Sequence, residues 1–367
     1  MGGIMRLKNK KTPIPYISLS RTETLMYRDE EYTDKNGVKC TRKKSLVKLD
    51  NGRILESFYS EMALTEIDLE IILDQYDFDE IGILKAMVAR KDYLPEEYRK
   101  VIQEYYNNKT ALKGDNTDQG LYLYTKSKNM LNSVYGMSAT DPIHQEITYC
   151  DGEYSRSSYE SMTEEEKAKA LKQAPFPYQW GVYTTALARQ QLQMAINLCG
   201  QKIIYCDTDS VKFVSDPRVS FDAYNEKRKA ASEASGAYAV DPKGNTHYMG
   251  VYEQEATADR FISWGAKKYA YCVGDDLKLT CAGVNKKIGA KELLKAGGLE
   301  AFKEGFVFKD AGGTESVYND FPEMDHYYVD GYKYIPITAN VVIRPSEYTL
   351  GLADDYRRLL YTLERFN

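Results

Sequence analysis

The sequence has few of the residues that build metal and disulfide sites. Among 367 residues there are only 3 histidines and 6 cysteines, and the cysteines are scattered without a C-x-x-C pair. This pattern excludes a zinc centre of the usual kind and fits free thiols in a reducing compartment. No run approaches the ~20 apolar residues that a membrane span needs. The N-terminus also lacks the apolar core and cleavage site of a secretory signal, so we expect cytosolic residence.

An excess of positive charge is missing as well. The formal net charge is −5, which argues against a protein that covers nucleic acid with its whole surface. Short basic clusters and 32 tyrosines leave room for local contacts with phosphates and bases. The length exceeds the ~250–300 residues at which single cores stop growing, so we expect more than one packed unit.

Hydrophobic periodicity predicts a mixed chain of helices and antiparallel strands. A turn-rich meander covers residues 13–54, and a short helix follows Thr65. Two helices, one opening at Pro95 and one running from 117 to 136, are joined by a brief polar turn and form a helical hairpin. Later elements are a charged insertion with one surface helix (152–174), a long helix (182–198) and two strands (202–205 and 210–214).

The strand junction contains the sharpest chemical signal, Tyr205-Cys-Asp-Thr-Asp-Ser210. Asp207 and Asp209 are two residues apart at the junction, so their carboxylates are expected on the same side of the sheet. Two carboxylates this close repel each other unless a cation neutralises them. Mg²⁺ prefers oxygen ligands and is usually held by one or two carboxylates plus substrate phosphates. The alternative is a turn that uses its aspartates only for backbone hydrogen bonds.

A second signal lies on the third predicted helix. Lys128, Asn132 and Tyr135 follow one another at i, i+4 and i+7 and therefore share a face. This face offers a cation for a triphosphate and a ring for a sugar and base, and Lys109 and Lys113 point to the same end of the hairpin. The alternative is an ordinary surface stripe. The opposite face has residues suited to packing: Leu123, Ser127, Met130 and Val134.

A third signal is a strand-like stretch that contains Lys267 and Tyr269, two residues apart. Such a pair on one strand face can hold a nucleic-acid strand by phosphate charge and by stacking or hydrogen bonding.

In this order, K-x-x-x-N-S-x-Y-G, Y-C-D-T-D-S and K-x-Y resemble the ordered motifs of family B DNA polymerases, and most closely the protein-primed bacteriophage branch. The resemblance implies an α+β right-hand polymerase fold, with an antiparallel palm sheet, helical-hairpin fingers and a small thumb. It divides the chain into a first insertion that docks a terminal protein (1–92), fingers (93–138), a second insertion for strand displacement (139–174), palm (175–283), and thumb with C-terminal tail (284–367).

The resemblance also implies residue roles. Asp209 would be a direct metal ligand and Asp207 its partner in a centre that uses two Mg²⁺ ions. Lys128 and Lys109 would contact the incoming triphosphate, Tyr135 would lie under the sugar and base, and Asn132 would support that pocket. Lys267 and Tyr269 would hold the primer end. The implied partners are primer-template DNA, deoxynucleoside triphosphates and a terminal protein, without a membrane, in the cytoplasm of an infected bacterium.

One motif of the family has no counterpart in these residues. A second metal-binding aspartate, in a run resembling D-x-x-S-L-Y-P, is absent, and so are the exonuclease carboxylate motifs. Because two-metal phosphoryl transfer needs carboxylates that bridge both ions, we expect this chain alone to be inactive or very weak. An upstream segment or a separate chain carrying the exonuclease and the missing motif would complete it, as in a split gene; a truncated reading frame and a decayed remnant are the other possible origins. One alternative is a non-catalytic DNA-binding scaffold with a palm fold. Another is a reverse transcriptase, but the sequence of Lys128–Gly136 resembles the family B form and argues against it.

Overall fold

The computed structural model describes residues 5–7, 12–33, 35–50, 52–90, 92–141, 147–150, 153–156, 162–174, 176–318, 327–329, 332–334 and 341–352. The chain forms two compact units, Met1–Tyr252 and Glu253–Asn367. The predicted region 175–283 spans the boundary between them. Within the described ranges, none of the helices combines the length and the apolar character needed to cross a membrane.

The N-terminal part of the first unit is built on a four-stranded antiparallel sheet. Its order is β5 (Val47–Asp50), β6 (Arg53–Ser57), β1 (Met5–Leu7) and β8 (Tyr76–Phe78). The other elements here are η1 (Leu19–Arg21), β2 (Glu23–Thr24), the hairpin of β3 (Tyr27–Thr33) and β4 (Lys39–Ser45), β7 (Ser60–Glu61) and α1 (Glu66–Gln75). Thr65 caps α1 in a capping box with Asp68, which confirms the helix predicted after Thr65. Ile54, Ile72 and Tyr76 belong to the small core between sheet and helix.

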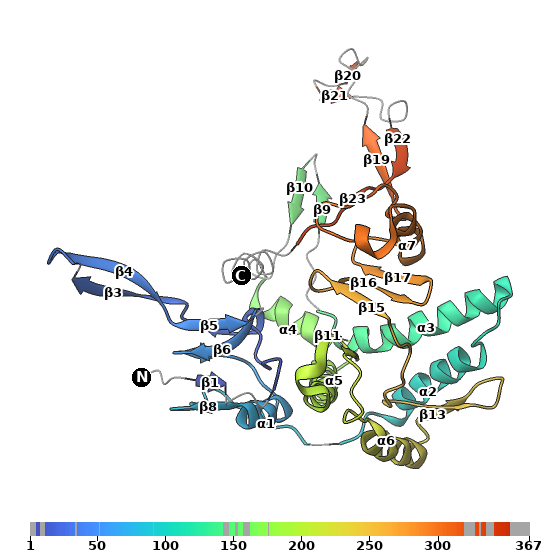
Figure 1. Cartoon of the computed structure of the whole chain (residues 1–367), viewed down its shortest axis with the longest axis horizontal. Helices are drawn as coiled ribbons and strands as arrows, with labels where there is room; N and C mark the ends of the chain where they lie inside the picture. Colours follow the sequence, from blue (N-terminus) through green and yellow to red (C-terminus); the bar gives the residue numbers. More distant parts are fainter. Residues whose placement is uncertain are drawn as a thin grey trace. The chain divides into compact units, whose positions relative to one another are not determined.

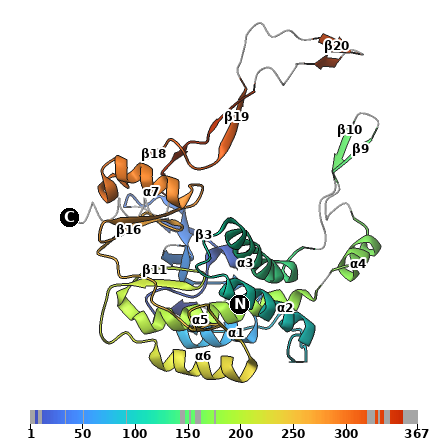
Figure 2. The same cartoon turned by 90° about the vertical axis from the view of Figure 1, so that its right-hand side faces the viewer.

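The helical hairpin follows as predicted. It consists of α2 (Glu96–Ala111) and α3 (Asp118–Ser138), which lie side by side in both views (Figures 1 and 2). Gly114 takes a left-handed φ of 90° in the turn that joins them, a conformation that costs glycine little. Thr117 then caps α3 by accepting a hydrogen bond from the amide of Gly120 at 3.0 Å.

The rest of the first unit is organised around a long helix. This helix, α5 (Tyr178–Cys199), leads through η3 (Gly200–Lys202) into the hairpin of β11 (Ile203–Asp207) and β12 (Ser210–Phe213). Helix α6 (Asp222–Ser235) and the hairpin of β13 (Tyr238–Val240) and β14 (Thr246–Tyr248) complete the unit, and α2 packs against β13. The predicted insertion contains β9 (Ile147–Cys150), β10 (Glu153–Arg156) and α4 (Glu164–Lys172), which has no buried residue, as expected of a surface helix.

The second unit places one helix against a three-stranded antiparallel sheet. The sheet contains β15 (Arg260–Ser263), β16 (Lys268–Val273) and β17 (Asp276–Cys281), and α7 (Lys286–Lys295) packs on β17. Gly289 allows the close approach, because a Cβ there would lie 2.5 Å from Val284 and 2.7 Å from Leu279. The remaining elements are η4 (Gly298–Ala301), β18 (Val307–Phe308), β19 (Thr314–Tyr318), β20 (Tyr327–Val329), β21 (Tyr332–Tyr334), β22 (Val341–Pro345) and β23 (Tyr348–Thr349).

The predicted mixture of helices and antiparallel sheets is therefore confirmed. The division of these elements into palm, fingers and thumb stays a prediction.

Candidate active site

The paired aspartates lie at the tip of the β11–β12 hairpin. Asp207 is the last residue of β11 and pairs with Ser210, so the turn contains only Thr208 and Asp209. Thr208 adopts a left-handed φ of 54°, which is unfavourable for a β-branched residue. Its hydroxyl donates a hydrogen bond to Oδ1 of Asp207 at 3.0 Å. Asp207 is half-buried and Asp209 is exposed. Both aspartates therefore lie at the tip of a two-stranded hairpin and are accessible to an ion.

Cations flank this acidic tip. The ammonium of Lys212 lies 3.3 Å from the hydroxyl of Ser210 and 5.4 Å from the centre of the Tyr205 ring. Burial raises the pKa of the Cys206 thiol, while the charges of Arg53 and Lys212 act in the opposite direction. The chain therefore supplies positive charge close to the strands as well as negative charge at their turn.

The acidic charge also reaches Tyr252. Burial raises the pKa of its phenol to about 12, and the neighbouring Tyr224 and the carboxylate of Asp209 act in the same direction. Asp209 therefore lies within electrostatic range of a half-buried tyrosine of the same unit.

Helix α5 supports the hairpin. It packs against both β11 and β12, and β11 lies beside α5 in both views (Figures 1 and 2). The amide of Val214 donates to the carbonyl of Lys202 at 2.8 Å and extends the ladder back to the end of the helix. On α5, Ala195 and Ile196 are buried, so the base of the hairpin rises from a packed helix.

The second predicted site, on α3, is open to solvent. Lys128, Asn132 and Tyr135 are all exposed, with 40% of Tyr135 accessible. The packed positions of α3 recur at helical spacing: Gly120, Tyr124, Ser127, Leu131, Val134 and Ser138. The predicted packing face is confirmed at Ser127 and Val134 and wrong at Leu123 and Met130, which are exposed, because the buried face is turned toward Tyr124 and Leu131. The lysine-asparagine-tyrosine stripe thus borders the packed face instead of lying opposite it.

Three lysines gather around the helical hairpin. Burial lowers the pKa of Lys109, and the charges of Lys128 on α3 and of Lys113 lower it further. The ammonium of Lys109 also lies 5.0 Å from the centre of the Tyr106 ring, within the range of a cation–π contact. A cluster of ammonium groups around one partly buried lysine suits a polyphosphate.

The end of α3 and the aspartate hairpin share α5 as their support. A Cβ on Gly181 of α5 would lie 3.0 Å from the carbonyl oxygen of Ser138 and 3.2 Å from Cβ of Ala139. A side chain there would push the neighbouring backbone away, so glycine favours this close approach of the helices. Aromatic rings reinforce the junction, since Tyr98 on α2 makes an edge contact with Trp180 on α5 at 5.2 Å. The hydroxyl of Tyr98 donates to the carbonyl of Val134 at 2.9 Å.

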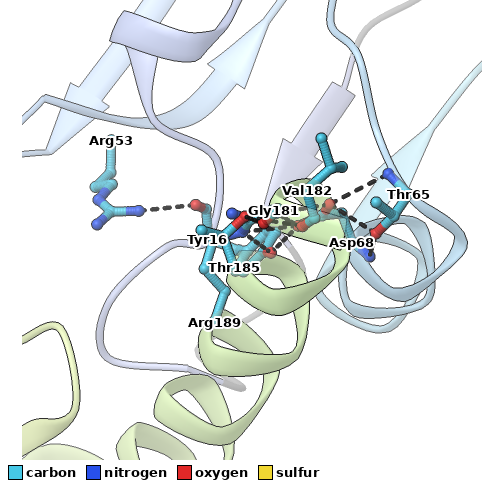
Figure 3. A network of polar contacts seen from close by, with 8 residues as sticks. All are labelled: Tyr16, Arg53, Thr65, Asp68, Gly181, Val182, Thr185 and Arg189. Atoms are coloured by element: carbon cyan, nitrogen blue, oxygen red, sulfur yellow. Dashed lines mark hydrogen bonds and ion pairs between the residues drawn. The ribbon is translucent and has the colours of Figure 1, made fainter. Parts of the chain in front are cut away.

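Sequence reasoning missed a buried polar network that anchors α5 to the N-terminal sheet (Figure 3). Arg189 on α5 holds the carboxylate of Asp68 with two nitrogens, at 2.8 and 2.9 Å, and the hydroxyl of Tyr16 donates to the same carboxylate. Burial alone would raise the pKa of Asp68, but the hydrogen bonds from Tyr16, Thr65 and Arg189 outweigh it and lower that pKa. Arg53 donates to the carbonyl of Tyr16 at 2.8 Å. The sequence signal for this network is Arg189, the one basic residue of α5, on a partly buried side of the helix.

Lys267 and Tyr269 belong to the second unit. Tyr269 lies on β16, and its ring stacks on Phe261 at 5.5 Å. Lys267 precedes the strand in a turn and has a left-handed φ of 56°. The prediction that Lys267 and Tyr269 share one strand face relied on strand alternation, but the strand begins only at Lys268.

Within the described parts of the chain, no three or more His, Cys, Asp or Glu side chains form a metal-binding cluster. Two carboxylates at one turn still fit Mg²⁺, which is commonly held by one or two carboxylates together with waters and substrate phosphates. The donor set of Asp207 and Asp209 therefore suits an ion that arrives with a nucleotide.

Comparison with known proteins gives consistent relatives. No family model matches the chain. The DNA polymerase of Bacillus phage phi29 is 26% identical over 315 residues, which cover 82% of this chain and 45% of that protein. The DNA polymerase of Bacillus phage PZA is 24% identical with the same coverage, and that of Bacillus phage Nf is 26% identical over 63% of this chain.

Solved structures of phi29 DNA polymerase are also similar. An orthorhombic crystal form matches with a TM-score of 0.46 and 18% identity, over 95% of this chain and 50% of that one. The complex with primer-template DNA matches with the same score at 19% identity. The chain thus spans about half the length of the relatives it matches. The resemblance expected from the motifs is confirmed: over most of its length this chain is similar to the DNA polymerases of phi29-like Bacillus phages.

Proposed function

We propose that this chain provides the nucleotide-binding and part of the metal-binding machinery of a template-directed DNA polymerase with a right-hand fold. The observation that carries the proposal is the common support of two sites by α5: the Asp207–Asp209 turn and the α3 stripe that begins at Lys128. Similarity to phage DNA polymerases supports the same reading. The protein would act on primer-template DNA in the cytoplasm of an infected bacterium.

The chemistry would be attack of a primer 3′ hydroxyl on the α-phosphate of a deoxynucleoside triphosphate, with pyrophosphate as the leaving group. Asp207 and Asp209 would hold the divalent cation. When bound, Mg²⁺ supplies positive charge for the attacking and leaving oxygens. The negative turn is short and fixed, so the carboxylates need little rearrangement to meet an ion.

The helical hairpin would hold the nucleotide. Lys128 and Lys109 would bind the triphosphate, because their clustered charges have no competing anion among the described contacts. Tyr135 would lie under the sugar and base, and Asn132 would support that pocket. In the second unit, Lys267 and Tyr269 would hold the primer end. A terminal protein would replace the primer at initiation.

Two-ion catalysis needs a further carboxylate besides those of the hairpin. We propose that a segment outside residues 1–367 supplies it, on the same polypeptide or on a separate chain. Residues 1–367 by themselves would then bind a nucleotide with its metal ion but extend a primer poorly or not at all.

The test is a binding titration with Mn²⁺ and a deoxynucleoside triphosphate, followed by electron paramagnetic resonance and calorimetry. We expect Asp209→Asn to weaken Mn²⁺ binding, and Lys128→Ala to weaken nucleotide binding, each by about tenfold, or roughly 1.4 kcal/mol. Asp275→Asn and Lys126→Ala are the matched controls, because Asp275 lies in another two-residue turn and Lys126 on the same helix.

Unchanged affinities in Asp209→Asn and Lys128→Ala would contradict the proposal and favour a non-catalytic scaffold. A loss in the control variants as large as in the test variants would show that the effect is not specific to the sites.

A further inference from the structure

The segment between β8 and α2 exposes an unusual amount of apolar surface. Its large side chains are accessible to 50% at Ile81, 80% at Ile83, 79% at Leu84, 83% at Met87 and 97% at Val88. In Figure 1 the connection that follows β8 and leads to α2 is drawn as a bare trace without helix or arrow. Contiguous apolar surface of this kind marks an interaction site in a native protein.

The sequence of this segment is that of a buried strand. The run Ile81-Gly-Ile-Leu-Lys-Ala-Met-Val88 is almost continuously apolar and is bounded by the charged residues Glu80 and Arg90. In an extended chain alternate residues face opposite sides. One side would carry Ile81, Ile83 and Met87 with Lys85 between them, and the other Leu84, Ala86 and Val88. One apolar face and one apolar face interrupted by a single lysine fit a strand that has neighbours along both edges and packing above and below.

The structure gives this strand-like sequence no strand to pair with. From Glu80 to Arg90 no backbone amide or carbonyl forms a hydrogen bond with any described residue. The preceding β8 is the edge of its sheet, with β1 as its neighbour there. Unpaired amides and carbonyls in an extended apolar segment are a template for strand addition.

We propose that Glu80–Arg90 is the docking strand for a β-strand from the part of the polymerase outside residues 1–367. This inference rests on the proposed function. The relatives extend well beyond the matched region, which is 45% of the phi29 polymerase, and the hairpin supplies only two of the carboxylates required. A strand that pairs here can bring its own apolar faces into the core and position a further carboxylate on the same unit.

Charge favours such a partner over a second copy of this chain. Lys85, at the middle of the segment, has no ion pair with any described residue, and Arg90 is 91% exposed. If two copies paired antiparallel over the whole segment, Lys85 would lie opposite Lys85, and like charges directly opposite each other are destabilising. A strand with an acidic side chain would instead complement it.

The experiment measures hydrogen–deuterium exchange of residues 80–90 by mass spectrometry. The probe is the polypeptide encoded directly upstream of residue 1, produced either joined to residues 1–367 or as a separate chain. In residues 1–367 alone these amides should exchange without protection at every protein concentration. With the probe their exchange should slow at least tenfold, because each paired amide then opens only with the strand.

Two kinds of variant make the result specific. Successive amides point to opposite edges of a strand, so Ala86→Pro and Met87→Pro each remove a donor from one edge. At least one of them should weaken probe binding about tenfold, as should Leu84→Asp. Leu171→Asp, on exposed helix α4, is the control and should leave binding unchanged. None of these changes should alter Mn²⁺ binding at the hairpin.

The inference is overturned if the segment is already protected in dilute residues 1–367, or if protection rises with concentration as for a second copy. It is also overturned if the upstream DNA encodes no strand-forming polypeptide, if exchange stays fast with the probe, or if neither proline affects binding. Its failure is distinct from that of the proposed function. Mn²⁺ and nucleotide binding can persist without strand docking, and the probe can dock to a chain whose Asp209 binds no metal.

Discussion

Two hairpins of this molecule have nearly the same turn and opposite surroundings. The β11–β12 hairpin turns through Thr208 and Asp209, and the β16–β17 hairpin turns through Gly274 and Asp275. In both turns the first residue is left-handed, with φ of 54° at Thr208 and 55° at Gly274. Glycine adopts this conformation freely, whereas threonine adopts it at a cost. One hairpin thus has the residue that the geometry favours, and the other has a strained one next to its paired carboxylates.

The strands below these turns differ as well. In β16 and β17, Ala270, Leu277 and Leu279 are buried in the core of the second unit, and alternate positions of β17 face outward. In β11 and β12 no residue is fully buried. The β11–β12 hairpin therefore depends on its contacts with α5, whereas the β16–β17 hairpin contributes fully buried apolar side chains to a core. Strain in a poorly buried hairpin is tolerated where function selects it, which agrees with a site at Asp207 and Asp209.

The largest expected effect comes from removing apolar side chains below each turn. Leu279→Ala should lower the free energy of unfolding of the second unit by about 2–5 kcal/mol, because it leaves a cavity in a packed core. Ile203→Ala in half-buried β11 should cost the first unit only about 1 kcal/mol. Urea unfolding, followed by hydrogen exchange of each hairpin, measures both. Equal losses would show that the two hairpins depend on burial to the same extent.

A threonine in the second turn should reproduce the cost that the first turn bears. Gly274→Thr places a β-branched residue at φ 55° and should destabilise the second unit by about 1–2 kcal/mol. Val273→Thr introduces the same side chain one residue earlier, in the strand, and serves as the control. If Gly274→Thr unfolds at the same urea concentration as the parent, the left-handed turn is not costly and the contrast between the hairpins loses its basis.

Local patterns were sufficient to predict most elements of the first unit, while the roles of the residues at the Asp207–Asp209 turn and on α3 stay predictions. Helix α3 was expected to end at residue 136 and ends at Ser138, and the strands around Asp207 and Asp209 lie within two residues of their predicted bounds. These features depend on periodicity and turn residues that are close in sequence. The packing face of α3 was right at Ser127 and Val134 and wrong at Leu123 and Met130, because contacts with α2 and α5 decide which side of the helix is covered.

Contacts between distant residues could not be predicted. The ion pair of Arg189 with Asp68 joins residues 121 positions apart, and in the sequence Asp68 is only an acidic residue in the first turn of a helix. The turn before β16 is a different case, because Gly265, with a φ of 114°, is a local turn signal two residues before Lys267. The ion pair depends on tertiary structure, whereas this turn has a signal in the sequence next to it.

The smallest expected effect is that of relieving the strained turn. Thr208→Gly should raise the free energy of unfolding of the first unit by about 1 kcal/mol, because the left-handed conformation no longer opposes a Cβ. The same change removes the 3.0 Å hydrogen bond from Thr208 to Asp207, so Mn²⁺ affinity, measured by electron paramagnetic resonance, should fall a few-fold, roughly 0.5–1 kcal/mol. Thr208→Asn is the control that separates the two effects: asparagine tolerates a left-handed φ, and its amide can donate to the same carboxylate. If Thr208→Gly raises both the stability and the Mn²⁺ affinity, the strained conformation of Thr208 does not help Asp207 and Asp209 to bind the ion.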